Sequence, residues 1–184
     1  HPDIVGLSVG TRPDCLPGDV LDLLGELNLK KPVTVELGLQ TIHPHTARLI
    51  RRGYDLPCFD QAVRELKSRN LEVVVHTILG LPGESKADIL KTMEYLNSCG
   101  IQGIKLQLLH ILRGTDLADL YAASPFPVLT LEEYVELVIA CLEHLSPNIT
   151  IHRLTGDGPK DLLIAPLWSQ KKTTVLNHIH HEMK

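Results

Sequence analysis

Polar side chains alternate with apolar ones along residues 33–40, a stretch that otherwise has the composition of a buried strand. At a period of two, one face consists of Val33, Val35, Leu37 and Leu39, and the other of Thr34, Glu36, Gly38 and Gln40. Burying even a neutral polar group without a partner costs about 2–7 kcal/mol. We therefore expect Glu36 and Gln40 to face a polar ligand in a barrel lumen. An edge strand with one face in water is the alternative.

Two later strands repeat the pattern. His76 lies on one face of residues 72–79, and Lys105 with Gln107 lies on one face of residues 103–110. Ligands of parallel α/β folds bind at the carboxyl ends of the strands, where Gly80 leaves room for a planar group. A histidine on a strand can also be a hydrogen-bonded core residue. Polar faces on three successive strands favour a shared ligand site.

Metal or imine chemistry is a second hypothesis. His43 and His45 flank a proline just after a strand end, and Lys105 could form a Schiff base with a carbonyl compound. Together with His76 they would make a TIM-barrel-type metal or Schiff-base lyase. No HExxH spacing supports the metal version. A third hypothesis is a non-catalytic module whose lumen only recognises a partner chain.

Residues 153–159 run from a strand end into a loop rich in glycine and aspartate. One interpretation is a tight turn followed by a helix cap. The other is a substrate loop at the mouth of the site, which would use Arg153 and Asp157. The pattern alone leaves both open.

Strands and helices alternate along the whole chain. Strands are predicted at 4–9, 33–40, 72–79, 103–110 and 149–153, and helices at 17–28, 46–51, 58–68, 85–97, 116–123, 131–145, 159–163 and 172–181. Ser85 and Thr130 each precede an acidic residue by three positions, which is typical of a capping box. Helical crossovers between strands predict a parallel sheet. Five strands are too few for a complete (β/α)₈ barrel.

Composition excludes several classes of protein. The 184 residues are 43% hydrophobic and carry a formal charge of −4, which predicts one globular core without the basic surface of a nucleic-acid-binding protein. No apolar run is long enough to span a membrane. The four cysteines show no disulfide-scaffold or CxxC spacing, so we expect reduced thiols and a cytoplasmic location.

Several motifs in order resemble the radical S-adenosylmethionine (radical SAM) superfamily, in the group of Elp3-like proteins and oxygen-independent coproporphyrinogen oxidase. They are similar above all to those of the YhcC-like radical SAM proteins. The motifs are Gly10-Thr-Arg-Pro-Asp14, Glu36-Leu-Gly-Leu-Gln-Thr41, Arg52-Gly53, Ile78-Leu-Gly-Leu-Pro-Gly-Glu84, Gly103-Ile-Lys-Leu106, Gly114-Thr115 and Arg153-Leu-Thr-Gly-Asp-Gly-Pro159. Each motif is weak alone, but together they cover nearly the whole chain.

The resemblance implies a partial parallel (β/α) barrel that binds S-adenosylmethionine beside a [4Fe–4S] cluster. It assigns cofactor contacts to Glu36, Gln40, Arg52, His76, Gly80, Lys105 and Gln107. Gln40 would contact the ribose, Arg52 the methionyl carboxylate through two parallel bonds, and Gly80 would flank the adenine. His76 stands where coproporphyrinogen-oxidase-like members have an acidic ribose contact. Arg12, Arg153 and Asp157 are the candidate substrate contacts.

The cysteine motif that holds the cluster in this family is absent, and Cys15, Cys58, Cys99 and Cys141 cannot replace it at their spacing. We expect the cluster ligands before His1, the first barrel strands to be missing, and this piece alone to be inactive. The intact protein would cleave S-adenosylmethionine reductively to a 5′-deoxyadenosyl radical. Residues 1–148 would form the truncated core and 149–184 a packed extension.

Expected partners follow from the same resemblance. The cofactor is a small molecule, and the substrate is unknown. The likeness to Elp3 raises tRNA as a substrate, but the charge of the chain does not support it. An exposed strand edge at residues 4–9 invites self-association.

Overall fold

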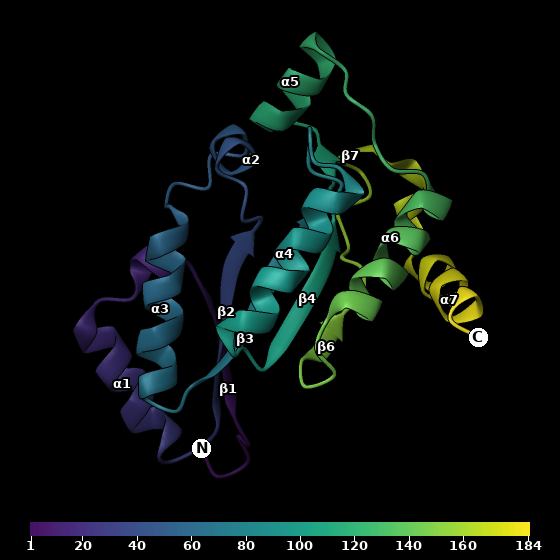
Figure 1. The fold of residues 1–184 in the computed structure, drawn as a ribbon. Coiled ribbons are helices and arrows are strands. Elements are labelled where there is room, and N and C mark those ends of the chain that lie inside the picture. Colours follow the sequence, from purple (N-terminus) through teal and green to yellow (C-terminus); the bar gives the residue numbers. More distant parts are fainter.

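Five parallel strands form the central sheet in the computed structural model, which describes residues 1–184 (Figure 1). The strands are β1 (Leu7–Thr11), β2 (Val33–Gln40), β3 (Glu72–Leu79), β4 (Gly103–Leu108) and β6 (Thr150–Arg153), in the spatial order β1-β2-β3-β4-β6. All four pairings are parallel. The predicted parallel α/β sheet is therefore confirmed.

Seven helices follow the strands, and several of them cover one face of the sheet. They are α1 (Gly18–Asn28), α2 (Pro44–Leu49), α3 (Leu56–Ser68), α4 (Lys86–Cys99), α5 (Asp116–Ala123), α6 (Leu131–His144) and α7 (Lys172–Glu182), with short 3₁₀ turns at Pro13–Cys15 and Leu167–Gln170. Figure 1 shows α3, α4 and α6 in front of the sheet and α2 at the end where β2 finishes. Both predicted capping boxes, at Ser85 and Thr130, are present.

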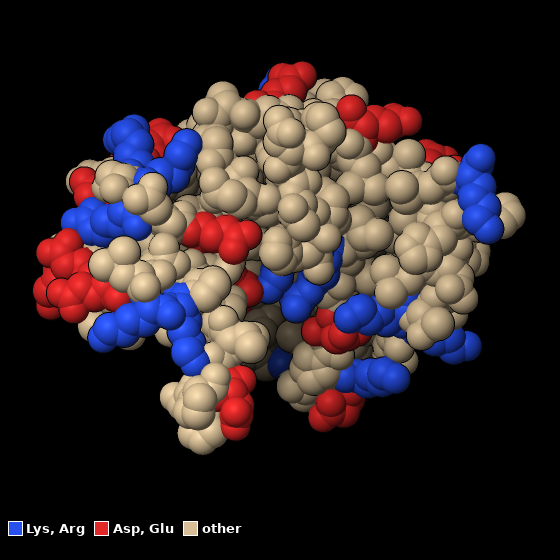
Figure 2. Space-filling view, turned by 90° about the horizontal axis from the view of Figure 1, so that it is seen from below, with Lys and Arg blue, Asp and Glu red and all other residues tan.

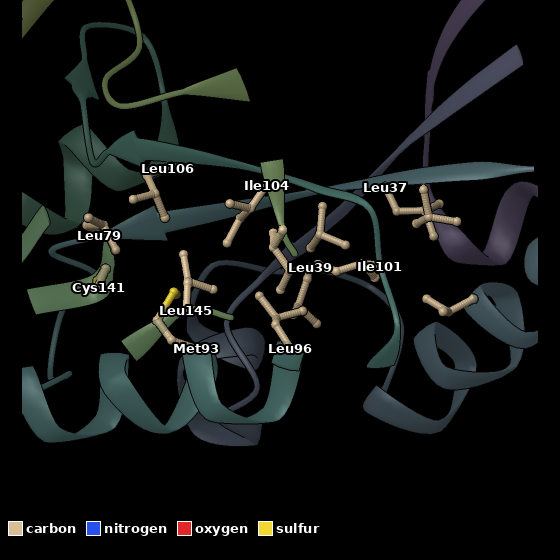
Figure 3. Packing of buried hydrophobic residues seen from close by; sticks show 14 of the residues in the cluster. Leu37, Leu39, Leu79, Met93, Leu96, Ile101, Ile104, Leu106, Cys141 and Leu145 are labelled. Atoms are coloured by element: carbon tan, nitrogen blue, oxygen red, sulfur yellow. The ribbon is translucent and has the colours of Figure 1, made fainter. Parts of the chain in front are cut away.

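The main core lies between the sheet and this helical layer. Val33, Val35, Leu37 and Leu39 of β2 are all buried, whereas their neighbours on the other face are partly exposed. Figure 3 shows Ile104 and Leu106 of β4 facing Met93 and Leu96 of α4. The alternation predicted from residues 33–40 is thus observed. It leaves the polar face of the sheet uncovered by this layer.

A smaller unit stands at the carboxyl end of the sheet. Strands β5 (Ile111–Leu112) and β7 (Leu163–Ala165) pair antiparallel, and α5 packs on them. Its separate core is centred on Ile111, Ala118 and Ala165. The helix predicted at 159–163 is wrong, because residues 160–162 form a turn and Leu163 pairs with Leu112. A partner about fifty positions earlier overrides the local helical pattern.

Strand β1 forms one edge of the sheet, because it pairs only with β2. The residues just before it and its first residue are apolar and exposed, with Val5 88% accessible. The edge predicted near residues 4–9 is therefore confirmed, although the strand itself begins at Leu7. Self-association through it stays a prediction. None of the helices has the length and apolar character needed to cross a membrane.

Candidate functional site: a polar cavity on the open face of the sheet

Glu36 lies at the centre of a row of polar side chains that crosses the uncovered face of the sheet. Its Oε1 accepts a hydrogen bond from Ser8 Oγ of the β1 strand at 2.8 Å. Its Oε2 contacts His76 Nε2 of β3 at 2.7 Å and forms an ion pair with Lys105 of β4. One carboxylate thereby joins four neighbouring strands.

His76 is held from both sides of its ring. Gln107 Nε2 lies 2.9 Å from His76 Nδ1, opposite the contact that Nε2 makes with Glu36. An amide nitrogen can only donate, and an ionised carboxylate can only accept. The two contacts therefore select the neutral ring with its proton on Nε2. Neither ring nitrogen is left for another partner.

Opposing effects set the charge of this row. Burial favours the neutral form of Glu36, but hydrogen bonds from Lys105, Ser8 and His76 outweigh burial and hold its pKa at about 2. Burial lowers the pKa of His76 below its usual value, against the hydrogen bond and charge of Glu36. At neutral pH the row therefore contains an ionised Glu36 and a neutral His76.

A cavity of about 850 Å³ opens above this row. Its polar lining residues include Thr11, Arg12, Glu36, Gln40, Arg52, Tyr54 and His76, and its apolar ones are Leu49, Ile50, Ile78, Leu81, Leu109, Leu117 and Leu120. Gly10 and Gly38 also line the cavity and contribute no side-chain bulk. A cavity of this size, lined by both polar and apolar side chains, suits a small organic ligand with a polar edge.

The end of β2 has an irregular backbone. Pairing with β3 shifts register between Gly38 and Gln40, and Gln40 has a φ of +62° in the left-handed region. Its side chain folds back along the strand, so that a Cβ at Gly38 would lie 2.5 Å from Gln40 Nε2. Tyr54 donates to the Gly38 carbonyl and lies 3.3 Å from Gln40 Oε1. The positive φ of Gln40 and its contact with Tyr54 thus orient its side chain into the cavity.

Arg52 stabilises the irregular end of β2 through hydrogen bonds to backbone carbonyls. Its Nη1 donates to the carbonyls of Leu39 and Thr41 at 3.2 and 2.7 Å, and its Nε donates to the carbonyl of Tyr54 at 3.0 Å. The residue is only 7% exposed. These bonds leave Nη2 as the nitrogen available to a ligand, instead of the two-nitrogen fork expected from sequence.

Arg12 is a further polar residue of the lining. Its guanidinium forms two hydrogen bonds with Asp14, at 2.9 and 2.7 Å. The guanidinium carbons of Arg12 and Arg52 both lie over the Tyr54 ring, at 5.5 and 4.8 Å from its centroid. Such cation–π contacts hold the phenol ring in place.

The other predicted site residues lie outside the cavity lining. Lys105 and Gln107 stand one strand behind it and act through Glu36 and His76. Gly80 faces Leu129 rather than the cavity. Asp157 forms an exposed ion pair with Lys172 at 2.7 Å. The structure thus brings together five predicted residues along the lining, namely Arg12, Glu36, Gln40, Arg52 and His76.

The histidines of the lyase hypothesis are not assembled. His43 Nε2 lies 2.9 Å from the carbonyl of Asp88, and His45 is exposed. Neither residue lines the cavity that contains His76. No group of three or more His, Cys, Asp or Glu side chains is arranged to hold a metal ion.

The part of the cavity lining contributed by α5, here called the roof, was not predicted from the sequence. Leu117 and Leu120 of α5 line the cavity, and Asp116 at the start of α5 forms an ion pair with Arg51, which follows α2. This contact joins residues 65 positions apart and has no local sequence signal. Tyr54 was also missed, although an aromatic residue directly after Arg52-Gly53 was a signal that could have found it.

Comparisons with known proteins identify the family of this chain. The family model described as the radical SAM superfamily matches residues 2–96, and that of the Radical_SAM C-terminal domain matches residues 101–184. The uncharacterized protein YtqA of Bacillus subtilis is 43% identical over 182 residues, which are 99% of this chain and 56% of YtqA. Protein YhcC of Escherichia coli K12 is 40% identical over 173 residues, 94% of this chain and 56% of YhcC.

Solved structures show the same fold. The Elp3 of the archaeon Methanocaldococcus infernus superimposes with a TM-score of 0.79 at 21% identity, over 92% of this chain and 42% of that one. Streptococcus suis SuiB bound to S-adenosylmethionine gives a TM-score of 0.58 at 11% identity, over 82% of this chain and 32% of SuiB. The sheet is therefore that of a partial parallel barrel. The chain spans little more than half the length of the curated relatives named above.

Proposed function

Because the chain belongs to the radical SAM superfamily, in its YhcC-like group, we propose that the cavity binds S-adenosylmethionine. The observation that carries the proposal is the convergence of Glu36, Gln40, His76 and Arg52 on one cavity of about 850 Å³. We further propose that the whole protein is a radical SAM enzyme that generates a 5′-deoxyadenosyl radical.

Each of these residues has a proposed role toward a different part of the cofactor. Gln40 is the proposed ribose contact, because its amide projects from the strained end of β2 beside Tyr54. Arg52 Nη2 is the proposed contact of the methionyl carboxylate, since Nε and Nη1 already bind carbonyls. His76 has no free ring nitrogen, so its proposed role is to shape the floor with its ring rather than to bond the ribose. The apolar lining residues support placement of the adenine against them.

The chain does not fit an iron–sulfur cluster. Three thiolates at one point are required, but Cys15 follows β1, Cys58 and Cys99 lie on α3 and α4, and Cys141 is a buried residue of α6. The cluster of the whole protein would therefore need ligands other than these four residues. The contribution proposed for residues 1–184 is to bind and orient cofactor and substrate.

Two further proposals concern the class of substrate and the location in the cell. Lys and Arg side chains intermingle with Asp and Glu over the face in Figure 2, which does not favour tRNA over a small-molecule substrate. All four cysteines are free thiols, which supports a reducing compartment such as the cytoplasm.

The test is S-adenosylmethionine binding measured by isothermal titration calorimetry on the described chain. We expect weak, saturable binding, and a loss of at least about tenfold in Gln40→Ala, where a polar ligand contact disappears. Gln61→Ala, at an exposed position of α3, is the matched control and should bind like the wild type. Equal affinity in Gln40→Ala and Gln61→Ala would show that the cofactor does not use this cavity.

A further inference from the structure

Two cations stand side by side on the open face of the sheet. Lys105 of β4 and Arg153 of β6 are Cα partners in the parallel pairing, after a register shift at Ile104. Side chains of paired residues leave the same face of a sheet, and like charges placed opposite each other destabilise it. The chain therefore maintains an unfavourable juxtaposition beside its cavity.

The one carboxylate in this row does not balance both charges. Glu36 pairs with Lys105, and Arg153 makes no side-chain hydrogen bond or ion pair although it is partly buried. Every other arginine of the site has a partner: Arg12 has Asp14, Arg51 has Asp116, and Arg52 has backbone carbonyls. Arg153 is the unpartnered cation of the site.

The charge is local. Around the cavity and its floor, the cations are Arg12, Arg51, Arg52, Lys105 and Arg153, against Asp14, Glu36 and Asp116, in a chain with a net charge of −4. A local positive excess in a hollow attracts anionic ligands.

We propose that Arg153, with Lys105 beside it, binds an anionic oxygen group of the substrate, either a carboxylate or a phosphate. The inference rests on the proposed function, since the substrate would lie on the same face of the sheet as the cofactor. An arginine suits this task because its planar fork donates two parallel bonds to such a group. Lys105 keeps its bond to Glu36 and adds positive charge. The anionic ligand neutralises the positive charge that Glu36 alone does not balance.

The experiment is a titration of the described chain with inorganic phosphate in one arm and acetate in the other. The shift of the Arg Nε–Hε resonances is followed by NMR in wild type, Arg153→Gln and Arg64→Gln. Arg64 is exposed on α3 and has no side-chain partner, which makes it the matched control. We expect saturable binding in wild type and Arg64→Gln, and at least about tenfold weaker binding in Arg153→Gln.

The arm that saturates at lower concentration identifies the chemical source, phosphate or carboxylate. No binding by the wild type, equal binding by Arg153→Gln, or equal weakening by Arg64→Gln each overturns the inference. Thermal unfolding verifies that Arg153→Gln is folded, and Arg153→Lys, which keeps the charge, should bind with intermediate affinity. S-adenosylmethionine affinity is measured in parallel. Its absence in the wild type refutes the proposed function alone, whereas an unchanged anion affinity in Arg153→Gln refutes only this inference.

Discussion

Glu36 of β2 and Lys105 of β4 form an ion pair across the intervening strand β3. Strands two places apart are separated by about 9.5 Å, so the contact requires a long lysine stem and a concave sheet face. His76 of β3 bonds to the same carboxylate oxygen that Lys105 contacts. The three central strands are thus joined by side chains as well as by their backbone ladder.

Replacing Glu36 tests the strength of this connection. Glu36→Gln keeps an acceptor oxygen but removes the negative charge and leaves a partly buried ammonium without its counter-charge, so we expect a loss of about 2 kcal/mol in the free energy of unfolding. Urea denaturation provides the measurement. Glu143→Gln, at an exposed position of α6, should change it by less than about 0.5 kcal/mol. Equal losses of stability in the two variants would show that Glu36 does not stabilise the fold through this ion pair.

Acid should weaken the fold through the same residue. The folded-state pKa of Glu36 is about 2, below its ordinary value of 4.5, so its contribution is complete above pH 4.5 and is lost as pH falls toward 2. We expect the free energy of unfolding of the wild type to fall more steeply over this range than that of Glu36→Gln. Parallel pH curves for both proteins would contradict the assignment.

His76 should be neutral at pH 7, with its proton on Nε2. Burial lowers the pKa of this ring below 6.5, so the unfolded chain binds the proton more readily and stability declines as pH falls through 6.5. Long-range ¹H–¹⁵N NMR reports both the tautomer and the titration. In Gln107→Leu, which removes the donor to Nδ1, we expect a changed Nδ1 resonance. A doubly protonated His76 at pH 7 would contradict the hydrogen-bond pattern.

Gln40 allows the roles of backbone and side chain to be separated. Its φ of +62° is tolerated by glycine but not by a β-branched residue, so Gln40→Val should be about 1–2 kcal/mol less stable than Gln40→Gly. Both variants lack the amide, and both should lose S-adenosylmethionine affinity. Chemical denaturation and calorimetry measure the two effects. Equal stability of the variants would show that the strand end relaxes.

The ion pair between Arg51 and Asp116 should affect the local opening of α5 more than the global stability of the chain. Both side chains are highly exposed, at 76% and 70%, and exposed pairs contribute about 0–1 kcal/mol. We expect Asp116→Asn to leave global unfolding nearly unchanged and to accelerate amide exchange in α5. Asp119→Asn, on the same helix and without a side-chain partner, is the control. Unchanged exchange in Asp116→Asn would show that the pair does not restrain the helix.

Local patterns predicted the parts of this molecule that depend on local physics. The alternation along residues 33–40 and the capping boxes at Ser85 and Thr130 appear as expected. The meeting of Glu36, His76, Lys105 and Gln107 was predictable because parallel strands place equivalent faces together. The helix expected at 159–163 failed, since β7 pairs with a distant strand.

Three details of the site could not be predicted for a similar reason. The engagement of Arg52 with the carbonyls of Leu39 and Thr41 depends on how the chain bends after β2. The contribution of α5 depends on contacts over more than sixty positions. The absence of a free nitrogen on His76 depends on Gln107 and Glu36 reaching it from two different strands.

The separate core of β5, β7 and α5 has a dynamic consequence. The strands beneath the cavity contribute their other face to a cluster of 30 buried residues, whereas the core cluster of the unit that carries the roof has only three, namely Ile111, Ala118 and Ala165. Segments with few buried contacts open at a lower free energy than the rest of a fold. We expect this roof to detach and reclose many times during the lifetime of the folded sheet. Ligand exchange can then proceed while the charged row beneath keeps its geometry.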